Sequence, residues 1–303
     1  MSLYQKYRPS QWAEVKGNTE VVETLVSMIG NRETCPHAFL LHGPTGCGKT
    51  TLGRIIAGEL GCRGSDFVEV DSADFRGIDT VRDIRRNAQY SAMEGECRVW
   101  LIDEVHKMTN DAQNALLKIL EDTPEHVYFI LATTEPNKLL STIRGRCSQF
   151  QVKPLSDQQM TRLLKVIALK EDKPVAPEVL EQIVMDSLGH PRNAIQILEQ
   201  VLNVNPEKQL AMAKRTAAEQ SQSIELCRAL MNKSGWKAVN EILKGMTDQE
   251  PESVRRAVLG YAQAVLLKSD NPLAGLILEQ FREPFYDCGF PGLTLACYLV
   301  VKN

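Results

Sequence analysis

The sequence lacks the features that carry a protein into or across a membrane. Its 303 residues contain no long uncharged apolar stretch, and the first residues, Met1 to Pro9, contain no apolar core of a secretory signal. Hydrophobic residues make up 43% and charged residues 24%, which is the balance of an ordinary soluble globular protein. We therefore expect a cytoplasmic protein of two or three domains with no membrane partner.

The sequence also lacks a basic excess and a zinc-binding pattern. Its formal net charge is −3, so any contact with DNA must come from a local basic surface or from one completed by other subunits. The eight cysteines are scattered, with no C-x-x-C pair and no Cys/His cluster at zinc-ligand spacing. This predicts reduced, mostly buried thiols and no structural zinc.

Strand and helix patterns alternate over residues 1–153. Short apolar runs rich in β-branched and aromatic residues predict strands of a parallel sheet that is buried on both faces. These runs cover residues 38–42, 67–71, 98–103 and 127–132. Between them, Gly61 is placed to end one helix, and Asp79 to cap another that begins at Thr80. The alternation predicts a doubly wound α/β domain.

Residues after Lys153-Pro154 show only helical periodicity. Ser156, Pro177 and Pro191 mark helix starts, and the segment 204–206 marks a break. We therefore divide the chain into an α/β domain over residues 1–153, a three-helix domain over 154–204 and an all-helical domain over 205–303, in which residues 254–267 form one amphipathic helix.

A phosphate-binding motif follows the first predicted strand and opens a helix. It fits G-x-x-x-x-G-K-[ST] and consists of Gly43, Pro44, Thr45, Gly46, Cys47, Gly48, Lys49 and Thr50. Its backbone N–H groups and the helix N-terminus attract phosphate oxygens. We expect these residues and the adjacent Thr51 to bind ATP, with Lys49 on the β- and γ-phosphates and Thr50 on Mg²⁺.

Two carboxylates, Asp103 and Glu104, end the third predicted strand. Ligands bind at this edge of open α/β sheets. Asp103 is expected to hold Mg²⁺, and Glu104 to orient and polarise the attacking water. A solvated acidic pair is the alternative interpretation, but the phosphate-binding motif about fifty residues upstream favours a functional pair. A kinase more often has its second carboxylate elsewhere, so the adjacent Asp103 and Glu104 favour hydrolysis.

Seven segments occur in an order that resembles the ATPase subunits of sliding-clamp loaders, an AAA+ family. They are residues 7–9, 43–50, 76–82, 101–106, 114–118, 132–136 and 143–147. Residues 101–150 are most similar to the bacterial gamma/tau subunit, and residues 76–82 to the small subunits of replication factor C. The resemblance covers about residues 3–203, and it implies that the three domains are the AAA+ P-loop domain, its helical lid and an oligomerisation collar.

The resemblance also implies site residues that spacing alone does not indicate. Thr133, in preference to Thr134, takes the position that contacts the γ-phosphate or the water. Arg146 reaches the ATP site of a neighbouring subunit, with Arg144 as a weaker competitor and Gly145 in place of the motif's serine. Arg192 contacts the γ-phosphate from the lid, and Tyr7 and Arg8 contact the nucleotide.

DNA and protein partners follow from the same resemblance. Arg76, Arg82, Arg85 and Arg86 cluster around one predicted helix, and the first two match positions that bind template phosphates without sequence preference. The clamp contact is expected around residues 90–96. The implied partners are a sliding clamp, primer–template DNA and other loader subunits. The resemblance implies a pentameric ring, whose other subunits are either copies of this chain or different chains.

The chain departs from the gamma/tau pattern in one respect. The four-cysteine zinc module that follows the P-loop helix in those subunits is reduced to Cys62, which suggests a compact viral or otherwise divergent homologue, in the host cytoplasm if viral. Three other functions stay open: a different AAA+ motor such as a helicase loader or a recombination-factor motor, a subunit that binds ATP without hydrolysis, and a small-molecule kinase.

Overall fold

The computed structural model describes residues 1–220, 222–247 and 249–302. They divide into two compact units, Gln5–Leu155 and Met1–Tyr4 with Ser156–Asn303, which we call the α/β unit and the helical unit. The first boundary lies two residues after the one expected from the sequence. The helical unit includes both segments expected as lid and collar, so their separation into two domains stays a prediction.

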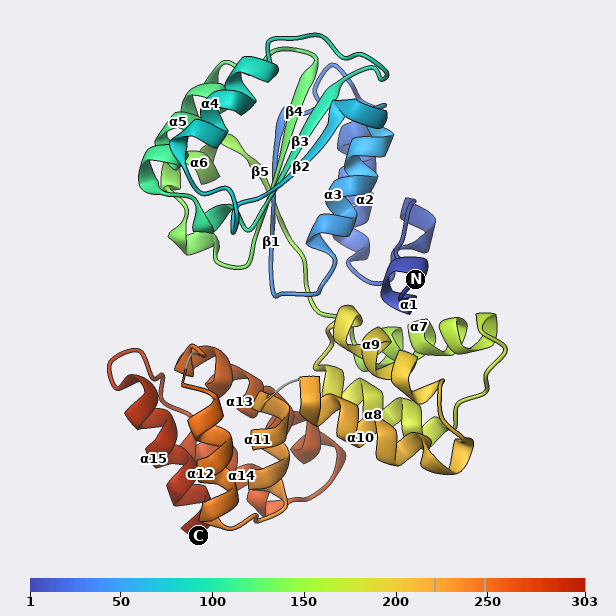
Figure 1. Ribbon diagram of the computed structural model, residues 1–303, viewed down its shortest axis with the longest axis vertical. Coiled ribbons are helices and arrows are strands. Elements are labelled where there is room, and N and C mark those ends of the chain that lie inside the picture. Colours follow the sequence, from blue (N-terminus) through green and yellow to red (C-terminus); the bar gives the residue numbers. More distant parts are fainter. Residues whose placement is uncertain (221, 248, 303) are drawn as a thin grey trace. The chain divides into compact units, whose positions relative to one another are not determined.

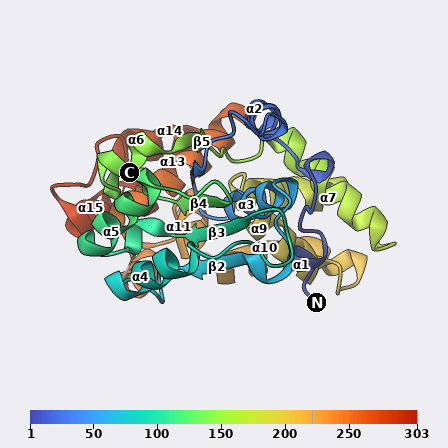
Figure 2. The ribbon, with the colours of Figure 1, turned by 90° about the horizontal axis from the view of Figure 1, so that it is seen from above.

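The α/β unit contains one parallel sheet with the strand order β2-β3-β4-β1-β5. Part of this order, from β2 through β3 to β4, can be followed in Figure 2. The strands are β1 (Ala38–His42), β2 (Phe67–Asp71), β3 (Arg98–Asp103), β4 (Val127–Thr133) and β5 (Ser148–Gln151). The first four confirm the predicted runs, with β4 one residue longer. Strand β5 was not predicted, because only Phe150 of this edge strand is buried and no apolar run marks it.

Helices cover both faces of the sheet (Figure 1). α2 (Thr19–Gly30) and α3 (Lys49–Glu59) pack against alternate strand residues such as Phe39 and Leu101. α4 (Ile78–Asn87), α5 (Asn110–Glu121) and α6 (Ser141–Arg146) pack against the other set, including Leu40 and Ile102. Burial of both sets explains why these strands are continuously apolar. The remaining short elements are α1 (Leu3–Lys6) and the 3-10 helices Trp12–Glu14, Gly64–Asp66, Val105–Lys107 and Pro136–Lys138.

The two predicted helix ends had different outcomes. Gly61 has a left-handed φ of 79°, and Cys62 N–H donates to the Ala57 carbonyl at 3.0 Å, which confirms a glycine C-terminal motif. The predicted cap at Asp79 is wrong. α4 begins at Ile78 after Gly77, and Asp79 lies inside its first turn, where its carboxylate accepts a hydrogen bond from Arg82 at 2.8 Å. Because α4 begins two residues before the expected Thr80, Asp79 already has helical backbone and cannot take the N-cap position.

The helical unit begins as predicted. Ser156 caps α7 with Gln159 in a reciprocal capping box, and Pro177 and Pro191 are the first residues of α8 and α9. The predicted break at 204–206 follows the end of α9 at Val201 and leads into a 3-10 turn, Pro206–Lys208; α13 contains residues 254–267. The helices are α7 (Asp157–Lys170), α8 (Pro177–Ser187), α9 (Pro191–Val201), α10 (Gln209–Gln220), α11 (Gln222–Met231), α12 (Trp236–Gly245), α13 (Pro251–Lys268), α14 (Pro272–Gln280) and α15 (Gly289–Lys302).

A buried ion pair joins the two halves of the helical unit. Asp186 of α8 is fully buried and accepts hydrogen bonds from Gln182 at 2.9 Å and from Arg228 of α11. Burial raises the pKa of Asp186 against the opposing effect of the Arg228 charge. The pair therefore ties the segment expected as a lid to the segment expected as a collar.

The structure also tests the composition-based expectations. Seven of the eight cysteines are buried and Cys288 is exposed, and all are free thiols, as predicted. Within the described ranges, none of the helices has both the length and the apolar character that a membrane crossing requires.

Candidate nucleotide site

The carboxyl ends of neighbouring strands bring the predicted site residues together. β1 lies beside β4, with His42 opposite Thr133, and β4 lies beside β3, with Ile102 opposite Leu131. The Gly43 N–H donates to the Thr133 carbonyl at 3.2 Å. The phosphate-binding motif, the acidic pair and the two threonines therefore meet at the carboxyl ends of these strands, where α/β proteins bind ligands.

The loop of residues 43–48 has the backbone that close phosphate approach requires. Gly43, Gly46 and Gly48 have φ values of 147°, 76° and 101°, which side chains disfavour. The Lys49 side chain is buried, and its Nζ donates to the carbonyls of Gly43 at 2.9 Å and Pro44 at 3.0 Å. The ammonium is thus held against the loop, where the phosphates of a nucleotide would offer it charged acceptors.

We expect Gly43→Ala to lower the free energy of unfolding by about 2 kcal/mol or more. A Cβ there would lie 2.1 Å from the Val152 carbonyl oxygen, in a backbone conformation that alanine resists. Urea unfolding followed by circular dichroism measures the change. Gly58→Ala is the matched control, because its Cβ in α3 meets nothing within 4 Å. This variant should raise the free energy of unfolding by about 0.5–1 kcal/mol, since alanine favours the helix. Equal stability of wild type and Gly43→Ala would contradict the geometry.

A direct hydrogen bond connects the phosphate-binding motif to the acidic pair. The Thr50 hydroxyl donates to Asp103 Oδ2 at 2.6 Å, and Asp103 Oδ1 accepts the Glu104 N–H at 2.9 Å. A hydroxyl and a carboxylate that converge from two elements are the oxygen ligands that Mg²⁺ prefers. The residues present therefore fit the predicted magnesium site.

Glu104 occupies a conformation that side chains rarely adopt. Its φ and ψ are 48° and 40°, in the left-handed region. Such strain persists where the surrounding structure imposes it, and it is common at functional sites. The conformation directs the carboxylate to the end of β4, where Oε2 accepts the Thr134 hydroxyl at 3.1 Å and lies 3.3 Å from His106 Nδ1.

The two threonines have different partners. Thr133 is fully buried, and its hydroxyl lies 3.0 Å from both the Glu135 N–H donor and His106 Nδ1. Thr134 bonds directly to Glu104. Thr133 was the preferred contact to the γ-phosphate or the water, whereas the structure brings Thr134 to the carboxylate expected to act on that water. His106, two residues after Glu104, had no assigned role.

The chain is similar in sequence to proteins of known family. Residues 64–156 match the family model described as DNA polymerase III, delta subunit. The DNA polymerase III subunit gamma/tau of Mycobacterium tuberculosis strain H37Rv is 38% identical over 225 residues, which are 67% of this chain and 39% of that protein. The chain is a homologue of the gamma/tau subunits of bacterial DNA polymerase III.

Two further matches extend this result. Subunit tau of Bacillus subtilis is 30% identical over 93% of this chain and 54% of its own length. The chain thus spans about half the length of these gamma/tau relatives, or less. The Holliday junction branch migration motor RuvB of Thermotoga maritima has a TM-score of 0.61 and 22% identity, over 78% of this chain and 85% of that one. This likeness confirms the expected fold, an α/β AAA+ sheet domain followed by helices.

In this gamma/tau homologue the two arginines of the 143–147 segment differ in exposure. Arg144 Nε is buried and has no hydrogen-bond partner among the described residues. Arg146 ends α6 with about a third of its side chain exposed (35%); it donates to the Thr142 carbonyl at 3.1 Å and pairs with Glu121 of α5. Arg146 is thus the more exposed of the two, and its contact with a neighbouring subunit stays a prediction.

The other nucleotide contacts expected from the resemblance stay predictions. Arg192 lies at the start of α9 in the helical unit, where its guanidinium is 5.0 Å from the centre of the Tyr4 ring and donates to the Tyr4 hydroxyl at 3.2 Å. No sequence pattern had indicated a role for Tyr4. In the α/β unit, the Tyr7 ring lies 5.4 Å from Lys6 Nζ, and Arg8 follows it.

The four arginines predicted to bind DNA are exposed, in and before α4. Arg76 precedes the helix and donates to the Ala73 carbonyl at 2.8 Å, Arg82 pairs with Asp79 at 2.8 Å, and Arg86 with Asp83 at 3.7 Å. Exposed pairs of this kind are weak, so they leave the arginines available to phosphates. Arg85 lies in the last turn of α4.

Asp66 holds the loop expected to contact the clamp. Its buried carboxylate accepts the N–H groups of Met93, Glu94 and Gly95 at 2.7–2.9 Å, and Arg98 at 3.3 Å. Burial raises the pKa of Asp66, but these hydrogen bonds outweigh it and hold the pKa below its ordinary value. These hydrogen bonds hold the backbone of residues 93–95 in place. The side chains of Tyr90 and Met93 in this loop are exposed.

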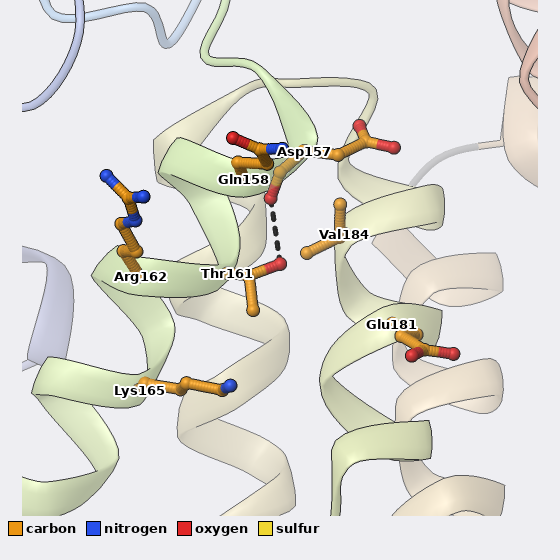
Figure 3. A pocket seen from close by; sticks show the side chains of 7 residues that line it. All are labelled: Asp157, Gln158, Thr161, Arg162, Lys165, Glu181 and Val184. Carbon is orange, nitrogen blue, oxygen red and sulfur yellow. Dashed lines mark hydrogen bonds between the residues drawn. The ribbon is translucent and has the colours of Figure 1, made fainter.

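An open pocket of about 520 Å³ lies in the helical unit, apart from the residues of the nucleotide site. Figure 3 shows its lining side chains on α7 and α8. Arg162 and Lys165 are balanced there by Asp157 and Glu181, and Thr161 donates to the Asp157 carbonyl at 2.8 Å. This mixed lining favours no particular ligand.

Proposed function

We propose that this chain is an ATP-hydrolysing subunit of a complex that loads a sliding clamp onto primer–template DNA. The observation that carries the proposal is the 2.6 Å hydrogen bond between Thr50 and Asp103, which couples a complete phosphate-binding motif to an acidic pair. Homology to gamma/tau subunits supports the choice of loader over other AAA+ motors.

Each residue of the nucleotide site has a separate role in the proposed hydrolysis. The N–H groups of residues 43–48 and the Lys49 ammonium bind the phosphates. Thr50 and Asp103 would hold Mg²⁺, which would supply positive charge beside the phosphates. Glu104, oriented by Thr134, accepts a hydrogen bond from the attacking water and polarises it, while the Arg146 of a neighbouring subunit stabilises the charge on the transferred group.

Surface side chains support the assignment of partners. Several apolar side chains of the helical unit are exposed, including Leu267 at 80% and Leu295 at 57%, and we assign this surface to contacts between subunits of the ring. Tyr90 and Met93 supply an apolar contact for the clamp. ATP binding closes the ring on clamp and DNA, and hydrolysis releases them.

Steady-state ATP hydrolysis with and without primer–template DNA, at low and moderate salt, tests the proposal. We expect primed junctions to stimulate the rate more than blunt duplex, for the chain alone or with its partner subunits and clamp. Stimulation should weaken as salt rises, since the contacts are to phosphates. A rate indifferent to primed DNA even with partners and clamp would reject loading in favour of another AAA+ motor.

Replacing Arg76 and Arg82 by alanine should reduce the stimulation by primed DNA while leaving the basal rate unchanged. Each lost phosphate contact is expected to lower the slope of log affinity against log salt by about 1. Arg282→Ala is the matched control, because this exposed arginine of the helical unit pairs only weakly with Glu283. Unchanged salt dependence in the double variant would remove these arginines from the DNA site.

A further inference from the structure

His106 connects two carboxylates that lie on opposite sides of its ring. It belongs to the 3-10 turn Val105–Lys107, and its side chain is 7% exposed. Nδ1 lies 3.0 Å from the Thr133 hydroxyl and 3.3 Å from Glu104 Oε2, whereas Nε2 lies 3.3 Å from Glu135 Oε1. Glu135 has a second partner, since Lys138 Nζ lies 2.8 Å from its other oxygen.

A neutral imidazole cannot serve both carboxylates. Burial lowers the pKa of His106, and the nearby Glu104 and Glu135, which raise it, do not overcome this effect; Lys138 and Lys107 lower it further. The neutral ring carries one N–H, so it donates on one side and presents a lone pair on the other. The choice of tautomer therefore decides whether the ring attracts or repels the Glu104 carboxylate.

We propose that His106 is a positioning residue for Glu104, and that Lys138, acting through Glu135, selects the tautomer that carries the proton on Nδ1. The Lys138 charge, 2.8 Å from Glu135 Oε2, weakens the attraction of Glu135 for a proton on Nε2, so the single N–H of the ring faces Glu104 and Thr133. Together with the Thr134 hydroxyl, it fixes Oε2 of Glu104 and leaves the other oxygen for the water. The importance of this relay for turnover rests on the proposed ATP hydrolysis.

The tautomer can be read directly by NMR without nucleotide. The chain has five histidines, so selective ¹⁵N-histidine labelling gives a simple long-range ¹H–¹⁵N spectrum, in which the signal missing from His106→Asn identifies His106. At pH 8 we expect the Nδ1–H form in the wild type and the Nε2–H form in Lys138→Met, where Glu135 has lost its cation. Lys107→Met, which removes a nearby charge without a contact to Glu135, should keep the Nδ1–H form.

Kinetics provide the second measurement. The amide nitrogen of asparagine lies near the position of Nδ1 and that of glutamine near Nε2, so His106→Asn should retain most of kcat. His106→Gln and Lys138→Met should each lower kcat about 10-fold, with little change in KM for ATP. A change in KM alone, or equal losses in the asparagine and glutamine variants, would indicate a merely structural role and overturn the proposal.

The two proposals fail separately. The absence of ATP hydrolysis by the wild type with its partners would reject the proposed function, while the spectra still decide the tautomer. An Nε2–H wild type, or the same tautomer in wild type and Lys138→Met, would overturn the relay even if the protein hydrolyses ATP.

Discussion

Replacing Glu104 by glutamine is expected to leave ATP binding intact and to lower turnover about 10²–10⁴-fold. Glutamine keeps the size of the side chain and an oxygen that can accept the Thr134 hydroxyl, so the site should stay assembled. It cannot take a proton from the attacking water. Titration with a fluorescent nucleotide measures binding, and single-turnover hydrolysis measures the chemical step apart from product release.

Glu125→Gln is the control for this variant. It makes the same change of charge on an exposed turn before β4, and it should hydrolyse ATP at the wild-type rate. Turnover of Glu104→Gln within a few-fold of wild type would refute the role assigned to this carboxylate. Loss of ATP binding would instead show that Glu104 is needed to assemble the site.

Arg146→Ala is expected to lower the rate of assembly-dependent ATP hydrolysis by about 10³–10⁵-fold. Each chain should keep its own affinity for ATP. The arginine lies at the exposed end of α6 and is proposed to act on the site of a neighbouring subunit. The rate should therefore be compared at protein concentrations below and above those at which the ring forms, with nucleotide binding measured separately.

Two companion variants sharpen this test. Glu121→Gln removes the in-chain partner of Arg146 but keeps the arginine, so turnover should persist. In rings that contain adjacent copies of this chain, mixing Arg146→Ala with Glu104→Gln should recover activity that neither variant has alone. The intact Glu104 of one subunit then meets the intact Arg146 of another. Full activity of Arg146→Ala alone would contradict the assignment.

Local patterns in the sequence were sufficient for the main elements of the fold. The apolar runs of β1 to β4, the capping box at Ser156 and the prolines that open α8 and α9 each depend on neighbouring residues. Edge strand β5 was missed because its pairing with β1, and not an apolar run, defines it. The Asp79 cap was wrong because α4 begins at Ile78, before the aspartate.

The sequence by itself determined which residues form the candidate nucleotide site, because the phosphate-binding motif is contiguous and the acidic pair ends an apolar strand. Only the tertiary structure decided which threonine reaches Glu104 and which arginine is exposed. It also showed that His106 lies between Glu104 and Glu135. These contacts join loops that are far apart in the sequence. The positions of the loops depend on strand order and register, which the spacing of residues along the chain does not give.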